Sequence, residues 1–200
     1  MKKIIFISLA VMAMAVLFTS CGTPAQVVNQ KKQKQELNEV IAWVNAAPND
    51  VIRGYGSDVD PDENYAYRHA IANARSQVAQ QIAAKIKDAV EAYRNRYEMA
   101  TTTQEGVKTQ KDTEGKTEDY LLQLSNELVS GAQPRETVVY TMPNGEIQVY
   151  IGIELSNNTL VDKIAAKKDE IQQAVNEEQR VKIDYNRDKF KASLEEAFKE

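Results

Sequence analysis

The chain contains one cysteine and one histidine in 200 residues, so a reactive thiol and a catalytic imidazole have one possible position each. Cys21 follows an uncharged run over residues 4–18, and two lysines precede that run. A positive segment, a short apolar run and small residues beside a cleavage point are the parts of a secretory signal. The run is also short for a membrane span, which needs about 20 apolar residues. We therefore expect residues 1–20 to be a signal segment that is removed.

The sequence LFTSC at residues 17–21 resembles the lipobox of bacterial lipoproteins, with Phe18 where leucine is usual. In that class the cysteine sulfur receives a diacylglycerol group before cleavage, and the cysteine becomes the new N-terminus. Lipidation of Cys21 would use the only thiol and leave none for a disulfide or a metal site. An uncleaved anchor helix and a cysteine in the folded core are the alternatives. The abrupt change to a polar stretch after Cys21 argues against the core cysteine.

Catalytic side chains are sparse. A Cys–His pair would need Cys21, which the polar segment after it holds away from the body, and His69 falls on the polar side of a predicted helix, where we expect it to be exposed. Two carboxylates such as Glu63 and Glu154 are a formal general acid and base, but 29 acidic residues make such pairs common by chance. We expect no enzymatic activity.

The triplet Asp58, Asp60 and Asp62 has the alternate spacing that opens a calcium loop. Such a loop needs glycine at its sixth position and a bidentate glutamate at its twelfth. Glu63 and His69 stand at those two positions. Zinc prefers cysteine and histidine ligands, which this chain lacks in number. We expect no metal and no cofactor.

The charge of the chain bears on its partners. Removal of residues 1–20 takes away two of 25 basic residues and none of 29 acidic ones, so the formal charge changes from −4 to −6. An acidic chain without a basic cluster disfavours nucleic acid and anionic lipid as partners. A content of 42% hydrophobic and 27% charged residues is typical of a globular, solvated protein.

The first predicted elements follow a polar tether at residues 21–35. Residues 36–44 have a helical apolar pattern, and residues 51–57 indicate a short strand. Within this strand, Gly54 and Gly56 mark a bulge or a close contact with another backbone.

A long amphipathic helix is predicted over residues 61–98. Asp60 as N-cap, Pro61 in the first turn and Glu63 three residues after the cap favour a capping box at its start. Alanines in its first turns would let a partner backbone approach closely. Arg75, at the edge of the apolar face, either pairs with a carboxylate on a strand or lays its stem on apolar surface. The predicted inward residues are Tyr67, Ile71, Ala74, Val78, Ile82, Ile86, Ala89 and Tyr93.

Residues 101–117 contain one apolar residue and two glycines, so we expect a mobile loop that is either disordered or functional. A second helix is predicted over residues 118–130, and Gly131 is expected as its C-terminal stop. Its expected inward residues are Tyr120, Leu121, Leu124 and Leu128.

Residues 134–155 predict a β-hairpin, because Asn144-Gly145 lies between two runs of alternating apolar residues. One face of its second strand is expected to be buried and the other wet. The fold class is therefore α+β, with a small antiparallel sheet of about three strands on the long helix and helical extensions at both ends. The alternating apolar residues are Val138, Tyr140, Met142, Ile147, Val149, Ile151, Ile153 and Leu155.

The chain is predicted to turn helical again from Asn158, with one apolar face formed by Leu160, Val161, Ile164, Ile171 and Val175. We expect the α+β domain to cover residues 36–175. Residues 176–200 are expected to leave it as a charged helical extension. Near the end of this extension, an apolar residue at every fourth position is either a stripe for partners or self-association, or part of a frayed end; these residues are Phe190, Leu194 and Phe198.

Two stretches, GYGSDVDPDENYAYRHAIANARSQVAQQIAAKI and LSNELVSGAQPRETVVYTMPNGEIQVYIGIEL, resemble the Lpp-twenty lipoprotein family over about residues 48–160. Its members carry a Gly-x-Gly strand, an alanine-spaced helix containing Ala-Arg, and a hairpin after a small-residue stop. The resemblance implies an outer-membrane lipoprotein with a sheet curled against a long helix, and it transfers no catalytic residues. A helical extension past Val175 is not a usual family feature. The matching positions are Gly54, Gly56, Ala66, Ala70, Ala74, Arg75 and Gly131.

Two functions follow as hypotheses. In the first, the chain is a noncatalytic, lipid-anchored component of the cell envelope that binds envelope proteins or itself. Gly22 after the cysteine, in place of the aspartate that retains some lipoproteins at the inner membrane, favours the outer membrane. No acidic cluster of the kind that tags some lipoproteins for surface export follows Cys21, so we expect the protein to face the periplasm. In the second, sheet and helix enclose a pocket of at least about 300 Å³ for a small apolar or aromatic ligand. Tyr93, Tyr140 and Tyr150 are its expected lining.

Overall fold

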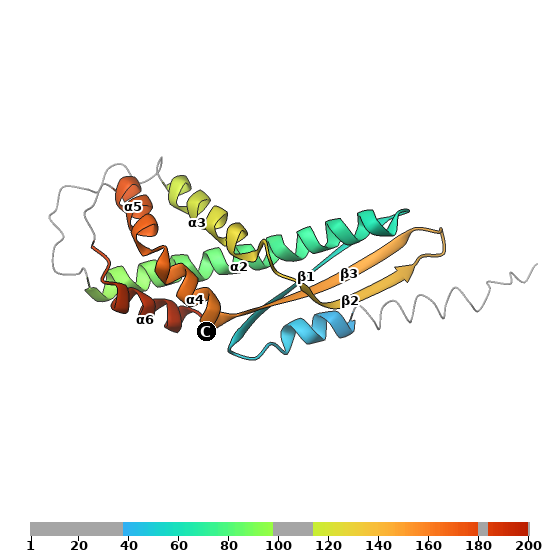
Figure 1. Cartoon of the computed structure of the whole chain (residues 1–200), viewed down its shortest axis with the longest axis horizontal. Coiled ribbons are helices and arrows are strands. Elements are labelled where there is room, and N and C mark those ends of the chain that lie inside the picture. The colour runs from blue at the N-terminus through green and yellow to red at the C-terminus, as the bar shows by residue number, and fades with distance from the viewer. Residues whose placement is uncertain (1–37, 98–113, 180–183, 200) are drawn as a thin grey trace, which may run out of the picture. The chain divides into compact units, whose positions relative to one another are not determined.

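The computed structural model describes residues 38–97, 114–179 and 184–199, all within a compact unit over Gln35–Glu200. The predicted signal segment, the tether with Cys21 and residues 101–113 of the predicted loop lie outside the described residues. The predicted α+β class is confirmed, with a three-stranded antiparallel sheet packed on a long helix (Figure 1). In the described ranges, no helix combines the length and the apolar character that a membrane crossing requires.

The sheet has the strand order β1-β3-β2, and both pairings are antiparallel. Its strands are β1 (Val51–Asp60), β2 (Pro134–Thr141) and β3 (Ile147–Ser156). The last two form the predicted hairpin, and its turn holds Gly145 at φ +88°, a left-handed conformation that glycine adopts without steric cost. β1 is longer than predicted, because its pairing with β3 continues as far as Asp60.

Helix α2 (Glu63–Tyr97) begins two residues later than predicted. Its cap is Asp62, whose carboxylate Oδ1 accepts hydrogen bonds from the backbone N–H groups of Asn64 and Tyr65 at 2.8 and 3.3 Å. The predicted cap at Asp60 is wrong, because the strand runs through this residue. Asp60 Oδ1 instead accepts a hydrogen bond from the backbone N–H of Asp62 at 2.8 Å and shapes the turn between strand and helix.

The buried face of α2 is narrow near its start and broader further along. Alanines at every fourth position are fully buried there, so the helix axis lies close to the sheet. Tyr67 was expected inward and is 37% exposed, because it lies about 100° around the helix from the buried alanine before it. The buried residues are Ala66, Ala70, Ala74, Val78, Ala79, Ile82, Ile86, Ala89, Val90 and Tyr93.

Helix α3 (Glu114–Val129) begins four residues earlier than predicted and packs against α2. Leu121 and Leu124 are buried, while Tyr120 and Leu128 are partly buried against the core. The helix ends just before Gly131, but this glycine has an ordinary φ and open space around it. Gly131 thus follows the end of the helix, as predicted, but without the left-handed conformation that glycine often adopts there.

The face of the sheet opposite α2 is also covered, because residues 38–45 form a helix along it (Figure 1). Trp43 lies so close to Gly152 that a Cβ added to this glycine would be 2.7 Å from the indole ring. Val40 and Tyr150 are 3% and 4% exposed. The prediction of a wet outer face is wrong for this part of β3.

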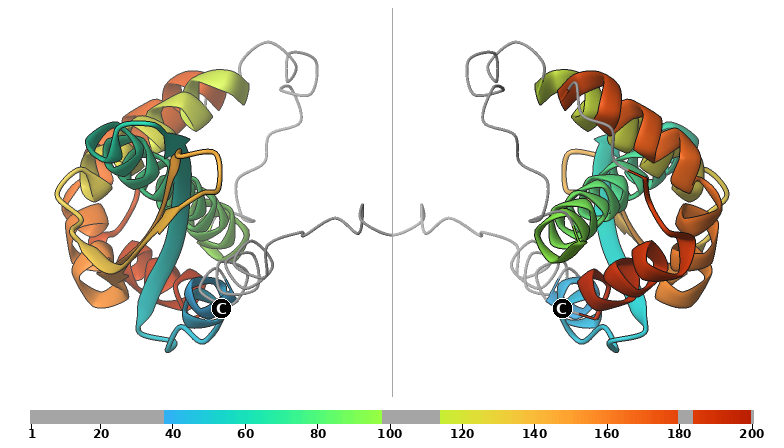
Figure 2. Two further views of the ribbon diagram at one scale, coloured as in Figure 1. Left: turned by 90° about the vertical axis from the view of Figure 1, so that its right-hand side faces the viewer. Right: turned by 90° about the vertical axis from the view of Figure 1, so that its left-hand side faces the viewer.

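The chain after the sheet forms α4 (Asn157–Ala166), α5 (Lys168–Gln179) and α6 (Arg187–Ala197). The predicted apolar face of α4 and α5 is buried, but the single helix expected here breaks at Lys167. The last helix does not leave the body. It starts at an Asn186 cap and packs against α2 and α4 (Figures 1 and 2). The predicted charged extension over residues 176–200 is wrong.

Candidate functional site

Strand β1 and helix α2 lie close together at the two glycines that the sequence singled out, with backbone atoms of α2 against Gly56 and side chains of α2 against Gly54. A Cβ added to Gly56 would lie 2.3 Å from both the carbonyl oxygen of Ala70 and the backbone nitrogen of Ala74. One added to Gly54 would lie 2.5 Å from Val78 Cγ2. The predicted close contact with another backbone is confirmed at Gly56, and so is the close approach that the early alanines of α2 allow, whereas Gly54 meets side chains.

The neighbouring strand shapes this contact further. Gly54 and Gly56 lie opposite Ile153 and Ile151 of β3. On this face of the sheet, two large side chains therefore lie next to two glycines, which have no side chain. Both isoleucines are fully buried. The helix therefore lies over β1, with the isoleucines filling the core beside it. This packing leaves no space between β1 and the first turns of α2 for a ligand.

Three amide side chains of α2 bind the outer edge of β1, at every fourth residue along the helix. Gln77 Oε1 accepts a hydrogen bond from the backbone N–H of Tyr55 at 2.7 Å. Asn73 donates to the carbonyl oxygen of Ser57 at 2.9 Å, and Gln81 donates to that of Arg53 at 3.3 Å. Sequence reasoning missed this ladder. The sequence feature that could have predicted it is the spacing of these amides, every four residues along one border of the apolar face.

Gln77→Ala should open this edge locally. The substitution removes the acceptor of the Tyr55 N–H, and the net loss of a hydrogen bond of about 1 kcal/mol should speed hydrogen exchange of that amide by roughly fivefold to tenfold. Gln80→Ala, on the exposed side of the same helix, is the matched control. Exchange rates followed by NMR test this. An unchanged rate for the Tyr55 amide in Gln77→Ala would contradict the ladder.

Among the described residues, Arg75 binds a backbone oxygen and not a carboxylate on a strand, which was the first of its two predicted roles. Its Nη2 donates a hydrogen bond of 2.9 Å to the carbonyl oxygen of Ala132, in the connection between α3 and β2. This bond brings Arg75 to the segment that holds Gly131. Both residues belong to the motif noted in the sequence, and the chain positions them on one side of α2.

Arg53 connects the sheet to the helix over residues 38–45. Its Nε donates to Glu154 Oε2 at 2.7 Å, and its Nη1 donates to the carbonyl oxygen of Trp43 at 2.8 Å. The guanidinium carbon also lies 4.2 Å from the centroid of the Trp43 ring. Sequence reasoning missed this cluster, because Glu154 comes from a strand 101 residues after Arg53.

The pair of carboxylates considered for hydrolysis is not brought together. Glu154 lies opposite Arg53 near one end of β1, whereas Glu63 follows the other end of that strand. Seven residues of strand separate Arg53 from Asp60, which is about 23 Å at 3.3 Å per residue. Carboxyl pairs that hydrolyse glycosides lie about 5–9.5 Å apart. These two glutamates therefore do not form such a pair.

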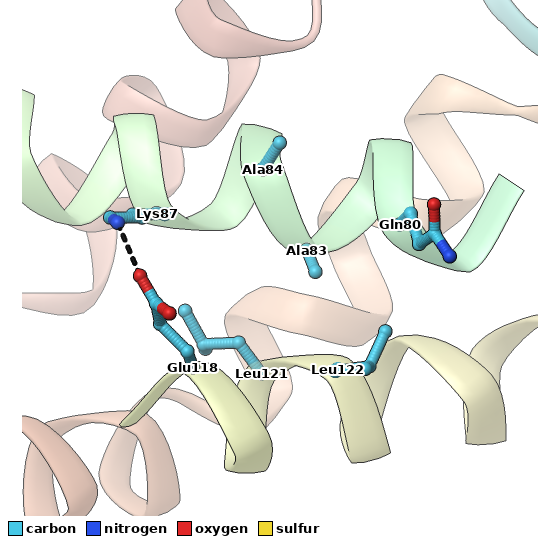
Figure 3. Close-up of a pocket in the computed structure, with 7 residues that line it drawn as sticks. All are labelled: Gln80, Ala83, Ala84, Lys87, Glu118, Leu121 and Leu122. Carbon is cyan, nitrogen blue, oxygen red and sulfur yellow. Dashed lines mark hydrogen bonds and ion pairs between the residues drawn. The ribbon is translucent and has the colours of Figure 1, made fainter. Parts of the chain in front are cut away.

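A shallow groove of about 240 Å³ lies between α2 and α3, with Leu121, Leu122 and two alanines on its walls (Figure 3). Lys87 of α2 and Glu118 of α3 form an exposed ion pair at one end of it. The volume is below the range of about 300–1,000 Å³ for pockets that hold drug-sized ligands. A ligand role stays a prediction. The lining residues are Gln80, Ala83, Ala84, Lys87, Glu118, Leu121 and Leu122.

The three tyrosines expected to line one pocket are not brought together. Tyr140 and Tyr150 lie on the face of the sheet opposite α2. Tyr93, in contrast, lies near the end of α2, where its ring meets that of Tyr185 edge to face at 4.7 Å between centroids. The predicted lining of a pocket by these residues is wrong.

The apolar stripe of the last helix is part of the core. Phe190 and Leu194 are 0% exposed and Phe198 is 3% exposed. The Phe190 ring stacks on Tyr185 at 5.0 Å between centroids. The Tyr93 hydroxyl accepts a hydrogen bond of 2.9 Å from the backbone N–H of Asn186, which fixes the start of the helix. The hypothesis that this stripe binds partners is wrong, because its side chains already cover α2.

A tyrosine of α3 and a glutamate of α5 are hydrogen-bonded to each other at the surface. The Tyr120 hydroxyl donates to Glu170 Oε2 at 3.1 Å. Burial, followed by the charge of Glu170, raises the pKa of Tyr120 to about 12. A hydrogen bond from Lys167 lowers the pKa of Glu170 below its usual value. Neither group of this pair is shifted toward neutral pH.

His69 is exposed on α2, as predicted, beside the ring of Tyr65 at 6.1 Å between centroids. Asp58 and Asp60 of the calcium-like triplet lie within β1. Over the described ranges, no group of three or more His, Cys, Asp or Glu side chains is placed to hold a metal ion.

Comparisons with known proteins found no relative of the chain: no family model, no curated protein and no solved structure matches it. The roles given to the residues above therefore come from the geometry of this chain. The resemblance to the Lpp-twenty family stays a prediction.

Proposed function

We propose that the chain is a noncatalytic protein of the cell envelope, held at the outer membrane by a lipid on Cys21 and facing the periplasm. The observation that carries the proposal is the position of the only cysteine, after LFTS, where an uncharged run gives way to a polar stretch. A thiol at such a junction fits acylation followed by cleavage. Two or more acyl chains suffice for stable anchoring, whereas one chain binds membranes only marginally.

The folded body buries its apolar side chains and several aromatic residues in one core. We propose that its partners are envelope proteins or further copies of the chain. Membership of the Lpp-twenty family, with Gly54, Gly56 and Arg75 as structural motif residues, is part of the same proposal.

Cys21→Ser should remove the acyl mass from the N-terminal peptide and leave residues 1–20 attached, because cleavage in this class follows acylation. The substitution removes the sulfur that would carry the lipid. Ser20→Ala keeps a small residue before the cysteine and is the control that should be acylated and cleaved like the wild type. Fractionation and mass spectrometry of the Cys21 peptide measure the outcome.

An unmodified Cys21 thiol in wild-type protein would contradict lipidation. A wild-type protein that is not acylated and retains residues 1–20 would instead support the uncleaved anchor. Both alternatives place the same body at a membrane, so the mass of the N-terminal peptide separates them.

A further inference from the structure

The two edges of the sheet differ in how their backbone groups are satisfied. The outer edge of β1 is closed by Asn73, Gln77 and Gln81 from α2. In the part of the chain that the structure describes, β2 pairs with β3 alone, and its other edge is bare (Figure 1). A bare edge presents unpaired N–H and C=O groups to which another strand can add.

The hairpin determines which residues of β2 turn their backbone N–H and C=O groups away from β3, toward the free edge. The backbone N–H of Met142 donates to the carbonyl oxygen of Glu146 at 2.7 Å, which makes this a hydrogen-bonded pair. Because such pairs alternate along antiparallel strands, Tyr140 and Val138 also turn their backbone groups toward β3. The backbone N–H and C=O groups of the residues between them point away from β3, toward the free edge of the sheet. These outward residues are Thr137, Val139 and Thr141, and all three are exposed.

The outward residues of β2 are complementary to themselves when the strand is reversed. With Val139 opposite Val139 of a second copy, Thr137 falls opposite Thr141, and Val138 falls opposite Tyr140. Threonine pairs and pairs of aromatic with β-branched residues are favourable across antiparallel strands. Val139 is 45% exposed and would gain an apolar neighbour.

Charges at the ends of the strand fit the same register. Arg135 would lie beside the hairpin turn of the second copy, which carries Glu146, and symmetry provides this contact twice. Arg135 is exposed, and its contact with Glu154 in its own chain is a loose 4.0 Å. Pairing would end there, because the register shifts between Pro134 and Glu136, and proline cannot donate to a ladder.

We propose that two copies of this chain pair antiparallel through β2 about a two-fold axis at Val139, which joins their sheets into one six-stranded sheet. The partner is a second copy because the strand complements itself in shape, pair type and charge. The pairing covers residues 137–141, so it belongs to the class of small, concentration-dependent interfaces. It does not depend on lipidation of Cys21.

The test uses the full chain with Cys21→Ser, followed by sedimentation over a range of protein concentrations. Val139→Lys and Val139→Glu each place two like charges opposite one another and should raise the dimer dissociation constant at least about tenfold. An equal mixture of the two variants should recover dimers, because lysine then faces glutamate. Val59→Lys, at a valine of β1 that is 40% exposed, is the control that should dimerise like the parent chain.

A near-isosteric variant keeps the test informative if a charged variant does not fold. Cα atoms of a hydrogen-bonded antiparallel pair lie about 5.5 Å apart, within the range of about 4.4–6.8 Å for disulfides. Val139→Cys in the Cys21→Ser chain should therefore form a disulfide-linked dimer on mild oxidation, whereas Val59→Cys should not. A parent chain that stays monomeric, a mixture that fails to recover dimers, or no crosslink through Val139→Cys would each overturn the proposal.

Discussion

Gly56→Ala is expected to lower the free energy of unfolding by about 3 kcal/mol or more, at the upper end of what overpacking costs. The added methyl group would lie 2.3 Å from two backbone atoms of α2, the Ala70 carbonyl oxygen and the Ala74 nitrogen. A side chain could rotate away from such a contact, but backbone atoms of a helix cannot. The helix must lift from β1, and the loosened contact weakens the packing of the fully buried alanines beside it.

Gly131→Ala is the matched control for this prediction. It makes the same chemical change at another glycine of the sequence motif, where a Cβ would meet nothing within 4 Å and φ is ordinary. We expect no loss, or a gain of about 0.4–1 kcal/mol from a stiffer unfolded chain. Urea unfolding followed by circular dichroism compares the two variants. Equal stabilities would show that the glycine contact does not limit how closely α2 approaches β1.

The elements that sequence reasoning predicted well are those with a strong local pattern. The hairpin follows from Asn144-Gly145 between alternating runs, and the class of the fold follows from this hairpin and one long helical pattern. The close contact at Gly54 and Gly56 could also be predicted, because glycine in a strand often marks a place where another part of the chain approaches closely.

The return of α6 to the body could not be predicted from its own residues. Phe190, Leu194 and Phe198 at four-residue spacing are equally compatible with an exposed stripe and a buried face. The deciding information lies in α2, which has 35 residues and is therefore about 52 Å long at 1.5 Å per residue. The ten residues of β1 reach only about 33 Å. The apolar face of α2 beyond the sheet thus needs further cover, which α3 and α6 provide.

The side-chain clusters that connect distant segments were the least predictable part. Arg75 could be placed at the border of the apolar face, but its partner is a backbone carbonyl oxygen 57 residues later. Arg53 likewise bonds Glu154 across 101 residues of chain. Local periodicity holds no information on such pairs. The strand register supplies it, and the register follows only once the sheet is assembled.

Phe190→Ala is expected to destabilise the fold by about 3–5 kcal/mol, the usual range for truncating a buried phenylalanine. The ring is fully buried, stacks on Tyr185 and lies 6.1 Å from Tyr93 between centroids. Its loss leaves a cavity over the part of α2 that the sheet does not reach. Chemical denaturation followed by near-ultraviolet circular dichroism measures both the stability and the order of these tyrosines.

A comparison of two leucines separates a core role of α6 from a surface role. Leu194→Ala, at a fully buried leucine of α6, should cost about 2–5 kcal/mol. Leu122→Ala, at a leucine of α3 that is 38% exposed, should cost well under half as much, because less apolar surface returns to water. If Phe190→Ala and Leu194→Ala were instead as mild as Leu122→Ala, the helix would not cover α2 in solution. The tyrosine signal would then also stay unchanged, since Tyr93 and Tyr185 would not depend on α6 for their packing.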